Sequence, residues 1–249
     1  LKIGVYNGMM TGSNNVDKLK DLLLFTSSND GKLCTLKEYT DRMAEGQKKV
    51  YYVSGKDKAT LDQLPQMETL RDKGIEVLYL FDPVDEFALE TIREYDGKSF
   101  QSINRGDLEL DDDASKEAKK ATEDMAKANE TLLKDVQDVL GDKVADVKLT
   151  STLKNGAVCL VADAQGPSLA MEHAFAAADN PMFKARRILE INPKHDLFGR
   201  LQKLHEAGKD SAEFVDYCGL LYDQALLIEG ILPSDPIAFA NKVASLMAK

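Results

Sequence analysis

Two short stretches of the chain combine side chains that could bind another molecule. The first is Asp85-Glu86-Phe87 with Glu90, in which an aromatic ring stands between carboxylates. Exposed together, these groups would form a surface for an apolar or a basic polypeptide. Carboxylates also suit the first turn of a helix, because they interact favourably with its dipole, and Phe87 would then be ordinary core. On spacing alone, this purely structural interpretation is favoured.

The second stretch begins at Ser168, a candidate helix N-cap that follows a Gly-Pro pair. Met171 and Phe175 fall on one stripe of the predicted helix. A flexible methionine beside an aromatic ring suits an apolar patch that accepts many partners. The alternative, which the residues alone favour, is a helix laid on the hairpin predicted at 143–162. The Gly-Pro pair favours an element that can separate from the sheet.

Motifs of common enzyme and metal sites are missing from the sequence. There is no P-loop, no G-x-G-x-x-G and no G-x-S-x-G elbow. His173, His195 and His205 stand singly, and the acidic run 111–113 lacks the Gly and Glu of a calcium loop. We therefore expect no catalytic, cofactor-binding or metal-binding residue. Three cysteines fit no zinc or disulfide spacing and are interpreted as buried or idle thiols of a cytosolic protein: Cys34, Cys159 and Cys218.

Charge and hydropathy exclude two classes of partner. The 249 residues include 32 Lys and Arg against 42 Asp and Glu, a formal net charge of −10. Nucleic-acid phosphates and anionic lipids attract the opposite balance, so we expect neither as a partner. No apolar run approaches the roughly 18 residues that span a bilayer. Because residue 1 is Leu, we expect the chain to begin inside a longer natural protein.

Short apolar strands alternate with helices over residues 1–106. Strands are predicted at 50–53, 75–81 and 99–103. Helices are predicted at 16–25, 36–44, 58–64, 67–73 and 84–95, the second with a capping box of Thr35 and Glu38. This alternation is typical of βαβ units with a parallel sheet. Within an α+β chain, we expect a small three-layer α/β/α module with short parallel strands.

An acidic linker at 107–113 separates this module from a second domain, 114–249. A long helix is predicted at 114–140, and strands at 143–153 and 157–162 should form a hairpin around Asn155-Gly156. A helix from Ser168 to about residue 178 and further helical turns at 184–189 follow. The tail is predicted to be helical at 196–207, 211–229 and from 235 to the end.

The tail helices carry more apolar surface than a small domain seems able to cover. Such faces most often close against a second copy, and two helices from each chain would make a four-helix bundle. The alternative is that they pack back within one chain. If the chain dimerises, we expect the contacts to come from Phe214, Cys218, Leu221, Ala225, Ile228, Phe239, Val243 and Leu246.

Several stretches together resemble one protein family. They are Glu38-Tyr39 with Arg42-Met43 and Gln47-Lys48; Val50-Tyr51-Tyr52; Gly74 to Leu80; Asp82 to Glu86; Asp96-Gly97-Lys98; and Leu189 to Pro193 with His195. The chain is similar to the ninety-kilodalton heat-shock protein chaperones, in their bacterial form. The similarity is collinear over nearly the whole chain.

The resemblance implies the end of the middle domain, residues 1–106, and the C-terminal dimerisation domain, residues 114–249. Members bind ATP in a separate N-terminal domain, so we expect this fragment to be no enzyme and to hold no cofactor. ATP and magnesium are implied for the parent protein. The implied partners are a second copy and unfolded clients in the cytoplasm. The family's client-binding positions correspond to Glu86, Phe87, Glu90, Met171 and Phe175.

Two alternatives to a client-binding, homodimeric chaperone fragment stay open. The α/β portion could be a small enzyme domain that handles a nucleotide or a sugar, which rests on analogy of fold alone. The chain could also be a purely structural dimerisation module without client contact.

Overall fold

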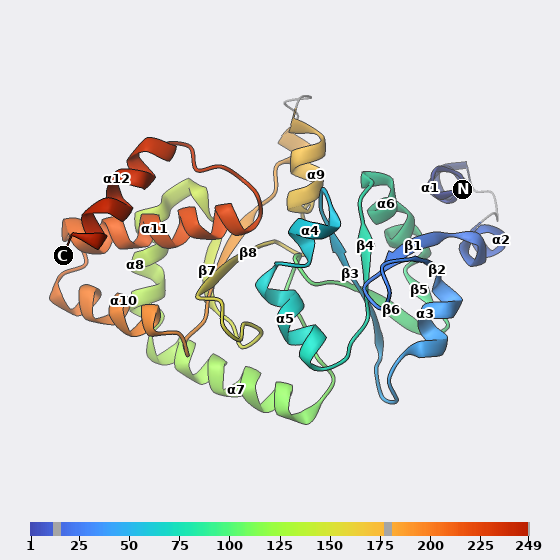
Figure 1. Ribbon diagram of the computed structural model, residues 1–249, viewed down its shortest axis with the longest axis horizontal. Helices are drawn as coiled ribbons and strands as arrows, with labels where there is room; N and C mark the ends of the chain where they lie inside the picture. The colour runs from blue at the N-terminus through green and yellow to red at the C-terminus, as the bar shows by residue number, and fades with distance from the viewer. Residues whose placement is uncertain (12–15, 177–180, 249) are drawn as a thin grey trace. The chain divides into compact units, whose positions relative to one another are not determined.

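The computed structural model describes residues 1–11, 16–176 and 181–248. It is a mixture of helices and sheets, which confirms the predicted α+β composition in outline. Contacts within the chain divide it into two units, drawn in Figure 1. Unit 1 is Leu1–Asp111 with Ala164–Ala185, and unit 2 is Asp112–Asp163 with Arg186–Lys249. Unit 1 therefore includes a segment that lies between two stretches of unit 2 in the sequence.

Unit 1 is built on a six-stranded sheet of order β2-β1-β4-β3-β6-β5. Its three inner strands β4, β3 and β6 are parallel, and the outer pairs are antiparallel. All four residues of β4 are buried, as expected for a parallel strand covered on both faces. The strands are β1 Leu24–Ser27, β2 Leu33–Thr35, β3 Lys49–Ser54, β4 Val77–Leu80, β5 Glu94–Tyr95 and β6 Lys98–Ser102.

The helices of unit 1 connect these strands. From β3 the chain passes through α4 and α5 to β4, and from β4 it returns through α6 to β6 on the other side of β3. Right-handed crossovers in opposite directions place α5 and α6 on opposite sides of the sheet, as Figure 1 shows. The helices are α1 Lys2–Thr11, α2 Val16–Leu19, η1 Lys20–Leu22, α3 Leu36–Arg42, α4 Lys58–Leu61, α5 Pro65–Asp72, α6 Pro83–Ile92, α9 Leu169–Ala174 and η4 Pro181–Phe183.

Local capping signals are confirmed where the sequence predicted them. The Thr35 hydroxyl accepts from the Glu38 N–H at 3.1 Å, and the Glu38 carboxylate accepts from the Thr35 N–H at 2.7 Å. Ser168 caps α9 by accepting from the Met171 N–H at 3.0 Å. Each bond satisfies a backbone donor that the first helical turn leaves unpaired, so these helices begin close to where they were predicted.

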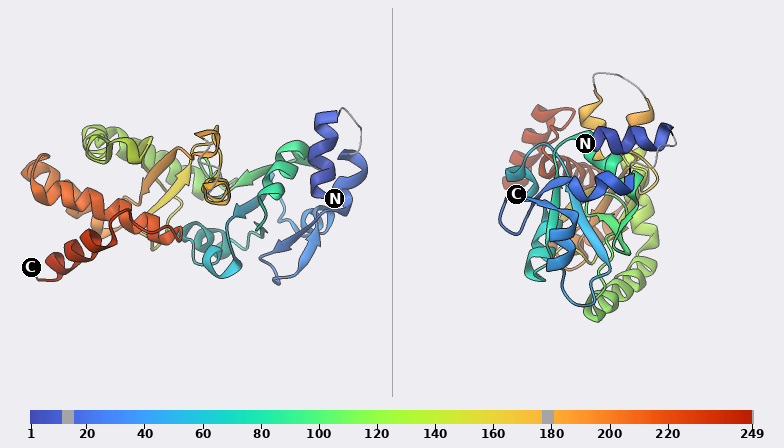
Figure 2. Two further views of the ribbon diagram at one scale, coloured as in Figure 1. Left: turned by 90° about the horizontal axis from the view of Figure 1, so that it is seen from above. Right: turned by 90° about the vertical axis from the view of Figure 1, so that its right-hand side faces the viewer.

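Unit 2 packs helices on a three-stranded sheet of order β7-β9-β8. Its strands are β7 Asp146–Leu149, β8 Val158–Ala162 and β9 Arg187–Ile191. Helices α8 and α11 pack against this sheet and against each other. Helix α12 lies beside α11 (Figures 1 and 2). The helices are α7 Asp113–Ala128, α8 Glu130–Leu140, η2 Gly141–Lys143, α10 Asp196–Ala207, α11 Ala212–Ile228 and α12 Pro236–Met247.

The predicted hairpin around Asn155-Gly156 is wrong. Strands β7 and β8 do not pair; β9 lies between them, parallel to β7 and antiparallel to β8. The Asn192 side chain, just after β9, donates to the carbonyl oxygens of Lys154 at 3.3 Å and Gly156 at 2.9 Å. These long-range bonds hold the 154–156 turn, which the local Asn-Gly signal could not reveal.

Three helix predictions also change. Residues 16–25 form two short helical turns and then β1, because Phe25 enters the buried sheet instead of continuing a helix. The long helix 114–140 is interrupted at Asn129, whose side chain donates to the Met125 carbonyl oxygen at 2.8 Å. The helical turns expected at 184–189 are largely replaced by β9. The end of the helix predicted to reach about residue 178 lies outside the described residues.

Residues 107–111 are attached to the unit 1 sheet. The Asp111 carboxylate accepts from the Lys48 N–H at 3.0 Å, and the Glu109 carbonyl oxygen accepts from the Tyr51 hydroxyl at 2.7 Å. Helix α7 then begins at Asp113 in unit 2. In the part of the chain that the structure describes, no helix is both long and apolar enough to cross a membrane.

Candidate functional site

Helix α6 positions the first group of predicted site residues. The Asp82 carboxylate accepts from the Val84 N–H at 3.1 Å, which starts the helix directly after β4. Asp85 is buried in the first turn and pairs with the Lys2 ammonium at 2.6 Å. Burial raises the pKa of Asp85, and Lys2 acts against that shift. The ion pair fastens α1 to α6.

Glu86 is 2% exposed and belongs to a group of four interacting side chains. The Ser168 hydroxyl donates to its Oε1 at 2.6 Å. Arg105 lies between two carboxylates, with Nη1 3.7 Å from Glu86 Oε2 and Nη2 2.8 Å from Glu90 Oε1. Burial raises the pKa of Glu86, and the Ser168 hydroxyl and Arg105 oppose the shift. Glu86, Glu90, Arg105 and Ser168 are called the Glu86 cluster below.

The aromatic side chains near the Glu86 cluster are partly exposed. The Phe87 ring lies 5.2 Å from the Tyr6 ring, centroid to centroid, in a tilted pair. On the far side of α9, Phe175 stacks on Phe183 with centroids 4.2 Å apart. Such pairs stabilise the rings without covering them fully, so each pair keeps apolar area available to a ligand.

The structure therefore separates the five predicted client-binding residues into two kinds. Phe87, Phe175 and Glu90 keep exposed surface. Glu86 and Met171 are buried, at 2% and 4% exposure, and cannot contact a partner in this conformation. The Glu86 contact to Ser168 nevertheless brings the two predicted stretches, α6 and the start of α9, together in unit 1.

Arg105 is the functional candidate that the sequence reasoning missed. It comes just after β6, at the carboxyl end of a parallel strand, and its side chain is only 15% exposed. The ends of parallel strands gather at one edge of a sheet, where polar residues converge from different segments. That rule, applied to the predicted strand 99–103, could have singled out Arg105.

The predicted dimer residues divide in the same way. Phe214, Cys218, Leu221 and Ala225 are at most 3% exposed within a single chain, because α11 packs them onto β8, α8 and α10. They are core residues and are not available to a second copy in this conformation. The remaining predicted residues keep at least partly exposed surface: Ile228, Phe239, Val243 and Leu246.

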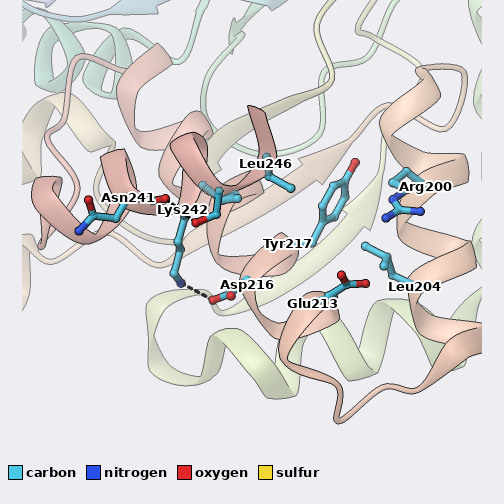
Figure 3. Close-up of a pocket in the computed structure, with 10 residues that line it drawn as sticks. Arg200, Leu204, Glu213, Asp216, Tyr217, Asn241, Lys242 and Leu246 are labelled. Atoms are coloured by element: carbon cyan, nitrogen blue, oxygen red, sulfur yellow. Dashed lines mark hydrogen bonds and ion pairs between the residues drawn. The ribbon is translucent and has the colours of Figure 1, made fainter. Parts of the chain in front are cut away.

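A groove of about 180 Å³ runs between α10, α11 and α12 (Figure 3). Leu204, Tyr217 and Leu246 contribute its apolar lining, and charged side chains surround them. Lys242 on α12 pairs with Asp216 on α11 at 2.9 Å, which ties the last helix to its neighbour. The groove is smaller than the roughly 300–1,000 Å³ of typical small-molecule pockets, so it better suits a few side chains.

Comparison with known proteins finds one family. The model of the family described as "Hsp90 protein" matches residues 1–249. Chaperone protein HtpG of Clostridium acetobutylicum is 44% identical over 248 residues, which are 99% of this chain and 38% of the relative. HtpG of Bacillus subtilis is 42% identical over 248 residues, which are again 99% of this chain and 38% of the relative. HtpG of Geobacter sulfurreducens is 42% identical over 236 residues, 94% of this chain and 36% of the relative.

Two expectations are corrected by these matches. We expected the chain to be no enzyme and to hold no cofactor. The comparisons contradict both, because the match to the Hsp90 family model covers all 249 residues.

The polar groove of unit 1 is a poor fit for a magnesium nucleotide. Within the described ranges, no group of three or more His, Cys, Asp or Glu side chains is placed to hold a metal ion. A polar groove of about 340 Å³ in unit 1 has two cations, but Lys58 pairs with Asp62 and Arg71 donates to the Asp62 carbonyl oxygen at 3.1 Å. Phosphate groups would have to compete with these bonds. We therefore derive no step through a nucleotide.

The matches agree with the motifs found along the sequence, from Glu38-Tyr39 to Asn192-Pro193. They extend over the whole chain, which spans a little over a third of the length of the curated relatives. A family model that covers every residue and relatives above 40% identity lead to one conclusion: the chain belongs to the Hsp90 family of chaperones.

Proposed function

We propose that this chain is the client-binding and self-associating part of an Hsp90 chaperone. Residues 1–106 would be the end of the middle domain, a three-layer α/β/α module. After the linker 107–113, residues 114–249 would be a dimerisation domain that ends in a helical bundle. The collinear family motifs support this assignment. Its partners would be unfolded proteins and a second copy, and its compartment the cytoplasm.

The observation that carries the client-binding proposal is two half-covered aromatic pairs, Phe87 tilted against Tyr6 and Phe175 stacked on Phe183. Each presents ring surface beside polar groups, the composition of a site that binds apolar segments. The Glu86 contact to Ser168 fixes α6 beside the start of α9. Unfolded clients expose the apolar side chains that such a surface accepts.

The test is client affinity of a double variant, Phe87→Ser with Phe175→Ser. Both rings are partly exposed, so their loss should weaken binding of a fluorescently labelled, permanently unfolded protein about tenfold or more. Fluorescence anisotropy measures the affinity, and circular dichroism checks that the fold is kept. Phe81→Ser is the matched control, because Phe81 is a 40% exposed ring of unit 1 that stacks on Tyr79. Equal affinities of the double variant and the wild type would contradict the proposal.

The last helix supports the proposed self-association. No residue of α12 is buried in the single chain, although most of its residues are apolar. Ile237 is 75% exposed, Leu246 47% and Met247 83%. An apolar helix left so open marks an interaction site, and two of the predicted dimer residues, Phe239 and Val243, lie on α12 and are partly exposed. A copy of the same helix would cover it across a two-fold axis.

A further inference from the structure

We propose that residues 164–176, called the α9 segment, are a strap docked onto helix α6 of unit 1 by the Glu86–Ser168 contact. Release of that contact uncovers apolar side chains for clients. Only the part of this inference that concerns client binding rests on the proposed function. The strap itself is defined by contacts within unit 1 and is tested without any client.

The strap lies where open α/β sheets normally bind ligands. Strand β3 is the switch point of the sheet, since the chain leaves it towards β4 and returns past it to β6. Ligands of such sheets bind outside the carboxyl ends of the strands at the switch point. At those ends the Asn104 side chain donates to the Ser54 carbonyl oxygen at 3.1 Å and accepts from the Ser102 hydroxyl at 3.1 Å.

The chain's own segment takes part in this polar edge. Ser168 has no exposed surface, and its hydroxyl both caps α9 and donates to Glu86. Leu169 and Met171 are each 4% exposed. Gly106, with φ +71°, allows the loop after β6 to approach the start of the segment, because an added Cβ would lie 3.0 Å from the Ala164 Cβ. A bulkier residue there would press against the strap.

Few interactions hold the α9 segment in place, so the Glu86–Ser168 contact can break without unfolding the sheet of unit 1. Helix α9 has six residues, too few to be stable without its contacts. Glu86 Oε2 lacks a hydrogen-bond partner among the described residues, so the bond from Ser168, the nearby Ser54 hydroxyl and the more distant Arg105 offset the burial of the carboxylate. The segment begins two residues after β8 of unit 2, and residues 177–186, which include η4, separate its end from β9. Once open, the segment would present Leu169, Met171 and Phe175 together.

The decisive variant is Ser168→Asp. Aspartate caps a helix as well as serine does, so the α9 cap is kept, but its charge faces the Glu86 carboxylate. Hydrogen exchange followed by mass spectrometry should show amides of 169–175 exchanging about tenfold faster or more, while β3 amides stay protected. Client affinity should increase. Adding Glu86→Gln should restore slow exchange, because the amide can donate to the new carboxylate.

Two further variants keep the test decisive. Ser211→Asp makes the same change at the N-cap of α11, which belongs to unit 2, and should leave α9 exchange unchanged. Glu86→Ala removes the acceptor and leaves the Ser168 cap intact, so it should speed exchange even if Ser168→Asp does not fold. Unchanged α9 exchange in folded Ser168→Asp and Glu86→Ala would overturn the strap. Faster exchange with unchanged client affinity would overturn the control of clients, whereas a wild type that binds no client would overturn the proposed function alone.

Discussion

Three buried carboxylates show how single residues shape this molecule. Asp85 is paired with Lys2, and Glu86 accepts from Ser168 and lies near Arg105. Glu229, the C-cap residue of α11, has an oxygen, Oε1, that is buried and has no hydrogen-bond partner among the residues that the structure describes. Burial raises the pKa of all three, for Glu229 to about 8. A neutral Glu229 at physiological pH is therefore part of the folded state.

Glu229→Gln should make the chain more stable in mildly alkaline solution. An unfolded Glu has a pKa of about 4.3, so between that value and about 8 the unfolded state loses its proton first. The free energy of unfolding of the wild type therefore falls as pH rises through this window. Above the window, the full penalty for burying the ionised Glu229 carboxylate is present. We expect the variant to gain on the order of 2–5 kcal/mol at pH 9 and little at pH 4. Urea unfolding at both pH values measures this; parallel pH profiles for the two proteins would contradict it.

Helices α8 and α10 of unit 2 are joined by one charged group. One oxygen of Asp135 on α8, Oδ2, lies 2.7 Å from Nε2 of the His205 ring. The other oxygen, Oδ1, accepts from the Lys209 ammonium at 2.9 Å. His205 and then Lys209 hold the pKa of Asp135 below its usual value. The His205 ring also packs on Phe214, centroids 5.4 Å apart. At His205, α10 is thus held to α8 by charge and to α11 by ring packing.

Asp135→Asn should destabilise the chain at neutral pH and reduce its sensitivity to acid. Because the folded pKa of Asp135 is lowered, its contribution is complete above the unfolded pKa of about 3.9 and is lost as pH falls through the folded pKa. We expect a loss of about 1–2 kcal/mol at pH 7 and convergence with the wild type near pH 2. Thermal unfolding across this range is the measurement. Asp138→Asn, on the same helix, is the control; equal losses in both variants would contradict a specific role for Asp135.

Elements were predictable where local signals determine them. The capping box at Thr35 and the Ser168 cap depend on neighbours three residues away, and both were confirmed. Strands β1, β2, β5 and β9 were missed. Pairing with strands distant in sequence decides the conformation of β1 and β9, whereas β2 and β5 are short edge strands that pair with their sequence neighbours β1 and β6. The candidate site followed the same division. Its aromatic rings stand out in the sequence, whereas Arg105 and the burial of Glu86 depend on which segments meet.

At the scale of the whole molecule, the proposed dimer depends on α12 and not on the buried face of α11. Ile237→Asp with Leu246→Asp places two charges on its exposed apolar surface and should raise the dimer dissociation constant about 100-fold or more. Ala121→Asp makes a comparable change on exposed α7 and should have no effect. Sedimentation equilibrium from nanomolar to micromolar concentration gives the constants. A wild type that stays monomeric at every concentration would refute the dimer.

The central claim is that this chain by itself binds unfolded protein. Sedimentation velocity with a labelled, permanently unfolded protein tests it most directly, since the absorbance of the label reports the client alone. We predict that the client moves with the faster boundary of the chain, and that an excess of the same client in its native, folded form does not displace it. A label that sediments at the rate of free client at every concentration of the chain would contradict the account.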